Sequence, residues 1–166
     1  MREMHWPPVR AGAELLVDRP RVIARRRGGL GQTLISGDLD AAVAALAPGA
    51  PMLGLYALAP EGAHALRIGR MSALLVTPAP LAVGDGWRDG WCATGVDDGW
   101  AAVDVSGADA QQALMQATAA DLGSGSASAA ILFFDLRGLL ARTSSGFRVH
   151  VEVPWLETLL AWLDGV

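Results

Sequence analysis

The fold is decided by the stretch Val96–Leu122, VDDGWAAVDVSGADAQQALMQATAADL. Within Ala101–Val105 every second residue is apolar and Asp104 faces the other way, which is typical of a half-buried strand. Ser106-Gly107 ends the strand, and the Ser106 hydroxyl can cap a following helix. Small apolar residues then recur at helical spacing, at Ala110, Ala113, Leu114 and Ala117. The stretch therefore predicts a strand, a tight turn and a helix that approaches a sheet closely.

Outward from this unit, the pattern predicts antiparallel strands and two more helices. The three predicted helices are Asp38–Ala47, Ala108–Ala119 and Pro154–Leu163. Between them we expect one or two strands in Glu14–Leu34 before a loop, and then strands at Pro51–Leu58, Ala65–Thr77, Ala129–Asp135, Leu139–Thr143 and Phe147–Val153. The fold class is α+β, with antiparallel strand hairpins and about three helices packed on the sheet. We expect an extended arm at 1–12 and a single domain at 13–166, whose two halves join near the irregular segment 78–98.

Composition excludes several classes of protein. The chain has 166 residues, of which 52% are hydrophobic and 18% charged, and its mean hydropathy is +0.32. Charge, Gly or Pro interrupts each apolar run before the ~20 residues that a membrane helix needs. No secretory signal is recognisable at Met1–Arg10, and Cys92 is the single cysteine, so we expect a cytoplasmic protein without disulfides.

All 13 basic residues are arginine. The absence of lysine excludes Schiff-base chemistry and a phosphate-binding P-loop lysine. Arg25-Arg26-Arg27 could bind phosphate or nucleic acid, but the net charge of −4 favours a solvated strand end or a patch that meets an acidic partner. We expect no nucleic-acid partner and no membrane partner.

Three segments in order resemble one known family. The run Ala65–Val76, ALRIGRMSALLV, resembles a strand pair of the gamma subunit of heterotetrameric sarcosine oxidase. Val103–Ala110, followed by Leu114 and Asp121-Leu122, is similar to the strand–helix segment of that family, and Phe147–Val166 to its terminal strand and helix. At Arg70-Met71 the sequence departs from the proline–acid pair of the family.

The resemblance implies a fold related to the folate-binding aminomethyltransferase domain. It implies a non-catalytic accessory subunit of a heteromeric flavin-dependent amine oxidase or dehydrogenase, without a cofactor of its own and bound to larger flavoprotein subunits. A stand-alone folate-binding or aminomethyl-transfer protein is the alternative, and a pocket holding Asp97 or Asp98 with Trp100 would favour it. A ligand-free homo-oligomeric module is the third hypothesis.

The candidate partner interface is the Gly- and Trp-rich loop Gly84–Trp91. Trp87, Arg88 and Trp91 are residue types enriched in interface hot spots, and Trp6 in the arm is a second candidate. The same rings could instead fold over the core, and the sequence favours neither alternative.

Other candidate residues have plainer interpretations. His150 alternates with apolar residues of its strand and is predicted on the wet face, while His5 and His64 stand in no metal or nucleophile motif. Asp97 and Asp98 are predicted to lie in a polar turn, and Cys92 is predicted to be an inert thiol. The sequence therefore predicts no catalytic residue and no metal ligand.

Overall fold

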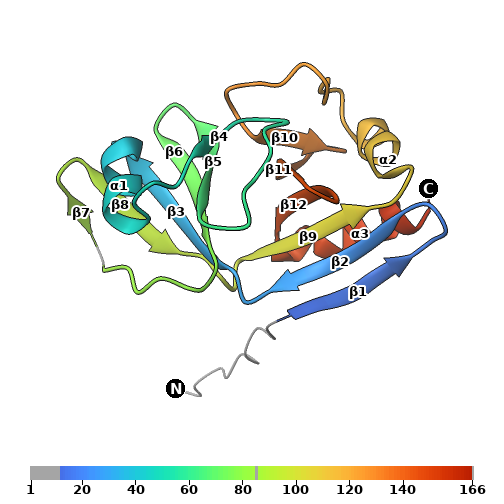
Figure 1. Cartoon of the computed structure of the whole chain (residues 1–166), viewed down its shortest axis with the longest axis horizontal. Helices are drawn as coiled ribbons and strands as arrows, with labels where there is room; N and C mark the ends of the chain where they lie inside the picture. The colour runs from blue at the N-terminus through green and yellow to red at the C-terminus, as the bar shows by residue number, and fades with distance from the viewer. Residues whose placement is uncertain (1–11, 85, 166) are drawn as a thin grey trace.

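Two six-stranded sheets form the framework of the protein. The computed structural model describes residues 12–84 and 86–165. Sheet A has the strand order β1-β2-β9-β12-β11-β10 and sheet B the order β4-β5-β6-β3-β8-β7 (Figure 1). Sheet A comprises β1 (Gly12–Asp18), β2 (Ile23–Gly28), β9 (Trp100–Ser106), β10 (Ala130–Phe133), β11 (Leu136–Thr143) and β12 (Gly146–Glu152). Sheet B comprises β3 (Gly31–Gly37), β4 (Met52–Leu53), β5 (His64–Gly69), β6 (Ser72–Thr77), β7 (Trp87–Arg88) and β8 (Trp91–Gly95).

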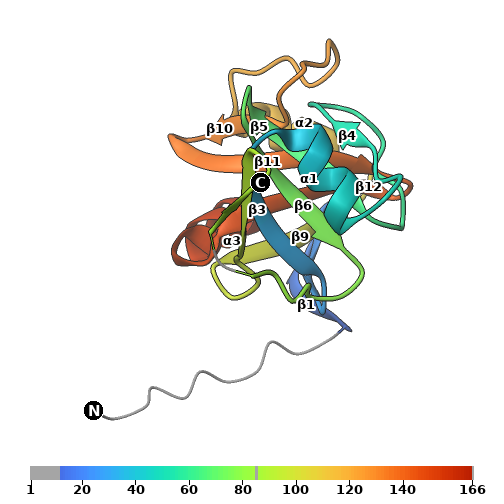
Figure 2. The ribbon, with the colours of Figure 1, turned by 90° about the vertical axis from the view of Figure 1, so that its left-hand side faces the viewer.

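Three helices cover the outer faces of the two sheets. Helix α1 (Leu39–Leu46) lies over sheet B, on the side that faces the viewer in Figure 2. Helices α2 (Ala110–Ala117) and α3 (Leu156–Asp164) pack on sheet A, and a short 3-10 turn, η1 (Val153–Trp155), precedes α3. A third apolar cluster joins the inner faces of the sheets, from Leu66 and Leu74 to Leu139 and Ala141. The α+β prediction is confirmed, but the helices pack on two sheets rather than one.

The central stretch folds as a strand, a turn and a helix. β9 pairs with β12 on one side and with β2 on the other, all antiparallel. Gly107 joins β9 to α2 with φ +111°, and a Cβ there would overlap the Arg21 carbonyl oxygen. Only glycine reaches this conformation in such a close approach without strain. Ser106 is not the cap: the N-cap position of α2 is Asp109, whose side chain makes no capping hydrogen bond.

The first helix is confirmed with its cap. The Asp38 side chain accepts a hydrogen bond from the Ala41 amide at 3.0 Å, as expected of an N-cap carboxylate. The third helix is also present, although Pro154 lies in η1 rather than at the start of α3. No helix among residues 12–84 and 86–165 is both long and apolar enough to cross a membrane.

Several strand predictions are wrong in detail. Gly31–Gly37, whose first residues were expected to lie in a loop, is β3, a central strand of sheet B. The segment expected to be irregular at 78–98 contains β7 and β8, and Pro51–Leu58 keeps only the two residues of β4. Leu136–Gly138, which separate the predicted strands Ala129–Asp135 and Leu139–Thr143, belong to β11 instead. The arm at 1–12 lies almost wholly outside the described residues, and its separation from a 13–166 domain stays a prediction.

Candidate functional site

The loop predicted as a partner interface is a tight β-hairpin. β7 and β8 pair antiparallel through Trp87–Cys92 and Arg88–Trp91. The two turn residues, Asp89 and Gly90, have φ values of +46° and +86°, as two-residue hairpin turns with matching twist require. The Gly90 carbonyl accepts a hydrogen bond from the Asp38 amide at 3.0 Å, which ties the hairpin to the start of α1.

The structure separates the two tryptophans of this hairpin. Trp87 is 67% exposed, although the edge of its ring lies against Gly37, where a Cβ would be 2.8 Å from its Cζ3. Arg88 is exposed, and its guanidinium lies against the Gly84 backbone. Trp91 is only 7% exposed and packs between sheet B and α1. Hence Trp87 and Arg88 are available to a partner, whereas Trp91 supports the hairpin from the core.

The other aromatic candidate, Trp6, lies outside the described residues. The interface role of Trp6, Trp87, Arg88 and Trp91 therefore stays a prediction, with Trp87 and Arg88 in the accessible position.

A buried polar layer, which the sequence did not indicate, lies between the two sheets. His150 of β12 and His64 of β5 are 0% and 1% exposed. The Nδ1 atom of His150 lies 2.7 Å from Oε1 of Gln32, and the Gln32 Nε2 donates to the Trp100 carbonyl at 2.8 Å. The prediction that His150 is on a wet face is wrong, because sheet B covers this part of sheet A.

Hydrogen bonding fixes the protonation pattern of this layer. A carbonyl oxygen only accepts, so Gln32 turns its amide nitrogen to Trp100 and its oxygen to His150, whose Nδ1 must carry the proton. His64 Nδ1 donates to the Gly62 carbonyl at 3.0 Å by the same logic. The Nε2 atom of each ring is thus a lone-pair acceptor, and neither has a donor among the described residues.

Burial keeps both imidazoles neutral. Burial, which is the largest cause, lowers the pKa of His150 together with the positive Arg148 and the neighbouring His64, to about 3 in all. Burial also lowers the pKa of His64, with the Gly62 hydrogen bond opposing the shift and Arg148 adding to it. Neutral rings that each hold one hydrogen bond through Nδ1 suit a structural role, and within the described ranges no nucleophile is hydrogen-bonded to either ring.

The adjacent residues Asp97 and Asp98 lie between β8 and β9. The Asp97 carboxylate accepts a hydrogen bond from the backbone N–H of Gln32 at 2.5 Å. This bond holds the segment that connects β8 to β9. Asp98 is exposed in the turn before Gly99. The two side chains therefore differ in environment, as expected for a polar turn.

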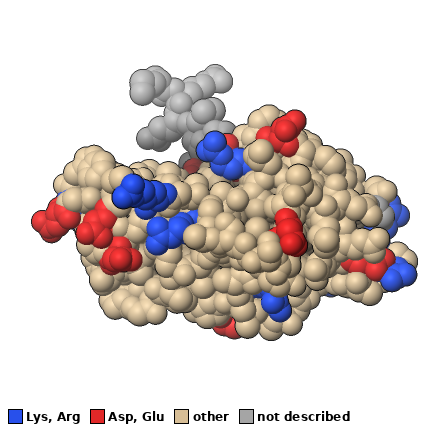
Figure 3. All heavy atoms as spheres, turned by 90° about the horizontal axis from the view of Figure 1, so that it is seen from above, with Lys and Arg blue, Asp and Glu red and all other residues tan. Residues whose placement is uncertain are grey.

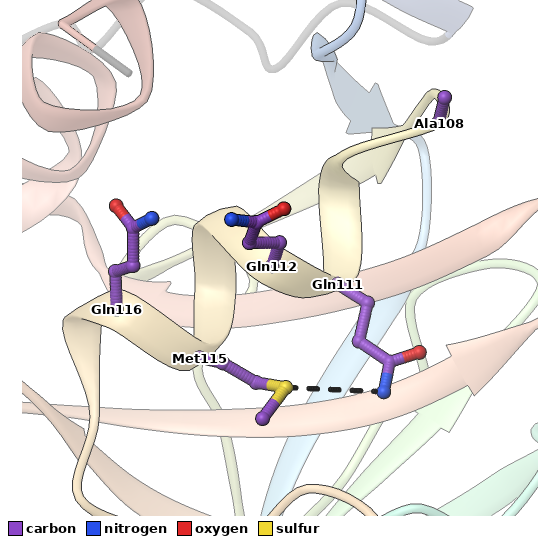
Figure 4. A pocket seen from close by; sticks show the side chains of 5 residues that line it. All are labelled: Ala108, Gln111, Gln112, Met115 and Gln116. Atoms are coloured by element: carbon purple, nitrogen blue, oxygen red, sulfur yellow. Dashed lines mark hydrogen bonds between the residues drawn. The ribbon is translucent and has the colours of Figure 1, made fainter.

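A hollow in the described surface lies on the outer face of α2. It is shallow, with a volume of about 430 Å³, and is lined by Ala108, Gln111, Gln112, Met115 and Gln116 (Figure 4). The Gln111 amide reaches the Met115 sulfur at 3.9 Å. None of the lining side chains is charged, so the hollow has neither a fixed charge nor a titratable group for catalysis.

Charged side chains and possible metal ligands are dispersed over the described residues. Across 12–84 and 86–165, no three His, Cys, Asp or Glu side chains gather as metal ligands would. Charged side chains are scattered in small groups over the face in Figure 3, with uncharged surface between them. The described residues thus provide a hairpin tip, a buried polar layer and a neutral helix face.

The comparisons with known proteins identify the fold. No protein-family model matches the sequence, and no curated protein matches it significantly. Among solved structures, the chain is similar to one in the heterotetrameric sarcosine oxidase from Corynebacterium sp. U-96 in complex with pyrrole 2-carboxylate, at 20% sequence identity and a TM-score of 0.73. The match covers 90% of this chain and 85% of that one. The two chains share a fold.

Proposed function

We propose that this chain is a small, non-catalytic accessory subunit of a heteromeric flavin-dependent amine oxidase or dehydrogenase of the sarcosine oxidase type. The observation that carries the proposal is the fold match over 90% of this chain and 85% of its counterpart, which makes the two chains similar in length. The counterpart is part of a heterotetramer, and a subunit of similar length and fold suits a similar place in a related complex. The proposed partners are larger flavoprotein subunits, and flavin chemistry belongs to them.

The tip of the β7–β8 hairpin is the proposed contact with such a partner. Trp87 offers a large apolar ring at 67% exposure, and Arg88 beside it offers a planar cation. Trp and Arg are enriched in interface hot spots, where a large ring or a planar guanidinium packs closely against the partner. Trp91 acts from beneath by holding the hairpin on the core, and Trp6 is a second proposed contact.

Coexpression tests this proposal. The chain is produced with the flavoprotein subunits encoded beside its gene, and the assembled complex is isolated through a tag on the largest subunit. We expect the wild-type chain in stoichiometric amount, and Trp87→Ala to weaken its affinity by about 30-fold or more, which corresponds to roughly 2 kcal/mol for one hot-spot ring. Melting of the isolated Trp87→Ala variant should match wild type.

The matched control is Leu58→Ala, which removes an apolar side chain that is 59% exposed outside the hairpin. It should change neither melting nor assembly. If the wild-type chain does not assemble, the proposal is wrong, and folate binding by calorimetry or self-association by light scattering then decides between the two alternatives. If Trp87→Ala assembles like wild type, the complex stands and the hairpin is not its interface.

A further inference from the structure

One face of sheet A continues past sheet B and is left open at β1 and β2. Residues directly opposite on antiparallel strands project from the same face. Arg25 lies opposite Leu15, and Arg27 lies opposite Ala13. All four of these residues are exposed, with Leu15 at 49%. We call this surface, made of Ala13, Leu15, Arg25 and Arg27, the arginine stripe. In Figure 1, α3 lies behind β9, β2 and β1, so it covers the opposite face.

The two arginines of the stripe lack the compensation that their neighbours have. Arg26 points to the other face, where Glu14 lies directly opposite. Arg19 and Arg21, in the β1–β2 turn, form ion pairs with Asp164 and Asp109 at 2.9 and 2.7 Å. Arg25 has Asp104 opposite on β9, but both oxygens of that carboxylate bind Arg148, at 2.6 and 3.0 Å.

Arg27 has only alanines opposite, Ala102 on β9 and Ala13 on β1. Within the described ranges, neither Arg25 nor Arg27 has an ion-pair partner. Two like charges two residues apart on one strand lie ~7 Å from each other and repel. An added anion would therefore relieve the electrostatic repulsion between the two cations of the stripe.

An open strand edge adjoins the stripe. β1 is the end strand of sheet A, so the backbone groups on its outer side have no strand partner in the described chain. Such an edge accepts an extended segment through main-chain hydrogen bonds. Every second side chain of that segment would project on the face of the stripe, at the ~7 Å spacing of Arg25 and Arg27. Ala13 is too small to screen Arg27 from a strand added beside it.

We propose that the β1 edge and the arginine stripe bind an extended acidic segment of a partner subunit, with carboxylates at alternate positions and an apolar side chain against Leu15. This inference rests on the proposed function, because it names the partner as a subunit of the same complex. A polypeptide fits better than nucleic acid, since an added strand uses the free backbone groups of β1.

Charge reversal in the coexpressed complex tests the inference. Arg25→Glu/Arg27→Glu should lower the affinity for the flavoprotein subunits at least tenfold, and the wild-type affinity should fall when NaCl is raised from 0.1 to 0.5 M. The matched control is Arg70→Glu/Arg137→Glu, which makes the same charge change at two exposed arginines away from the stripe. Hydrogen exchange of the wild-type complex should show new protection of the β1 amides.

The possible failures are distinguishable. If the wild-type chain does not assemble at all, the proposed function fails and this inference with it. If the wild-type chain assembles and the stripe variant assembles equally well, or the β1 amides gain no protection, the proposed function stands and the inference is wrong. If a 20-base-pair DNA duplex binds the wild-type chain at 0.15 M NaCl and not the stripe variant, the stripe is a nucleic-acid surface and the inference is overturned.

Discussion

One face of sheet A is buried along part of its width and exposed along the rest. On β11 and β12 this face is buried beneath sheet B, so that Leu139 and His150 are both 0% exposed. On β1 and β2 the same face meets no covering layer, and Leu15 and Arg25 are exposed. The strands alternate in the same way in both halves, which we call the covered half and the open half.

The difference teaches that alternation assigns side chains to faces but does not say what covers a face. The chain leaves sheet A after β2, builds all of sheet B from β3 to β8, and returns at β9. Sheet B therefore folds back over the strands that come later, β11 and β12, and leaves β1 and β2 uncovered. A histidine in the covered half becomes a buried group, whereas arginines in the open half stay in water.

The largest expected effect compares one substitution in the two halves. Leu139→Ala should lower the free energy of unfolding by about 3 kcal/mol, because it leaves a cavity between the sheets. Leu15→Ala in the open half should change it by less than about 1 kcal/mol, since that side chain is 49% exposed. Urea unfolding of both variants measures the difference. Equal losses would mean that the open half is covered in solution.

The covered half should also make stability depend on pH. The pKa of His150 is lowered from 6.5 to about 3 in the folded protein, and that of His64 is lowered too. Below pH 6.5 the unfolded chain binds protons that the folded chain does not, so stability is full above pH 6.5 and falls as the pH drops toward 3. We expect a loss of about 2 kcal/mol from His150 between pH 7 and pH 5.

His150→Leu is the control for this pH dependence. Leucine does not titrate, so the decline between pH 7 and pH 5 should become shallower, whatever the variant does to stability at pH 7. Thermal melting at a series of pH values provides the measurement. An identical slope in wild type and variant would show that His150 titrates normally in the folded protein and that the covered half admits water.

Local signals in the sequence predicted local structure well. Asp38 indicated the start of α1 because a short carboxylate before an apolar helix face caps free amides. Gly107 indicated a tight junction between β9 and α2, and the positive φ and the nearby Arg21 carbonyl agree with that. The family resemblance is supported at the level of the fold, because the chain shares its fold with a chain of a sarcosine oxidase structure. The relation to the folate-binding aminomethyltransferase domain stays a prediction.

The sequence analysis did not predict the contacts between residues far apart in the chain. His150 follows the pattern of a half-buried strand, and only the second sheet, 118 residues away at Gln32, removes it from water. Trp87 and Trp91 are chemically alike and four residues apart, and the turn between them sends one outward and one into the core. The β10–β11 turn was misplaced because Phe134 and Asp135 take positive φ values that glycine would have indicated.

The smallest expected effect lies at the boundary between the two halves. Arg148 and Asp104 pair there through two hydrogen bonds, with side chains that are 11% and 28% exposed, whereas the Arg19–Asp164 pair at the rim of the open half is 49% and 55% exposed. Solvent weakens an exposed pair, and a partly buried two-bond pair keeps more of its energy. Asp104→Asn should therefore cost about 1 kcal/mol and Asp164→Asn less than about 0.5 kcal/mol in urea unfolding. Loss of the Asp104 carboxylate leaves Arg148 without its ion pair, close to Arg25, and 0.5 M NaCl should recover part of the cost by screening that repulsion. If the two variants lose the same amount of stability, the Arg148–Asp104 pair is as accessible to solvent as the Arg19–Asp164 pair. The covered half would then end at His150.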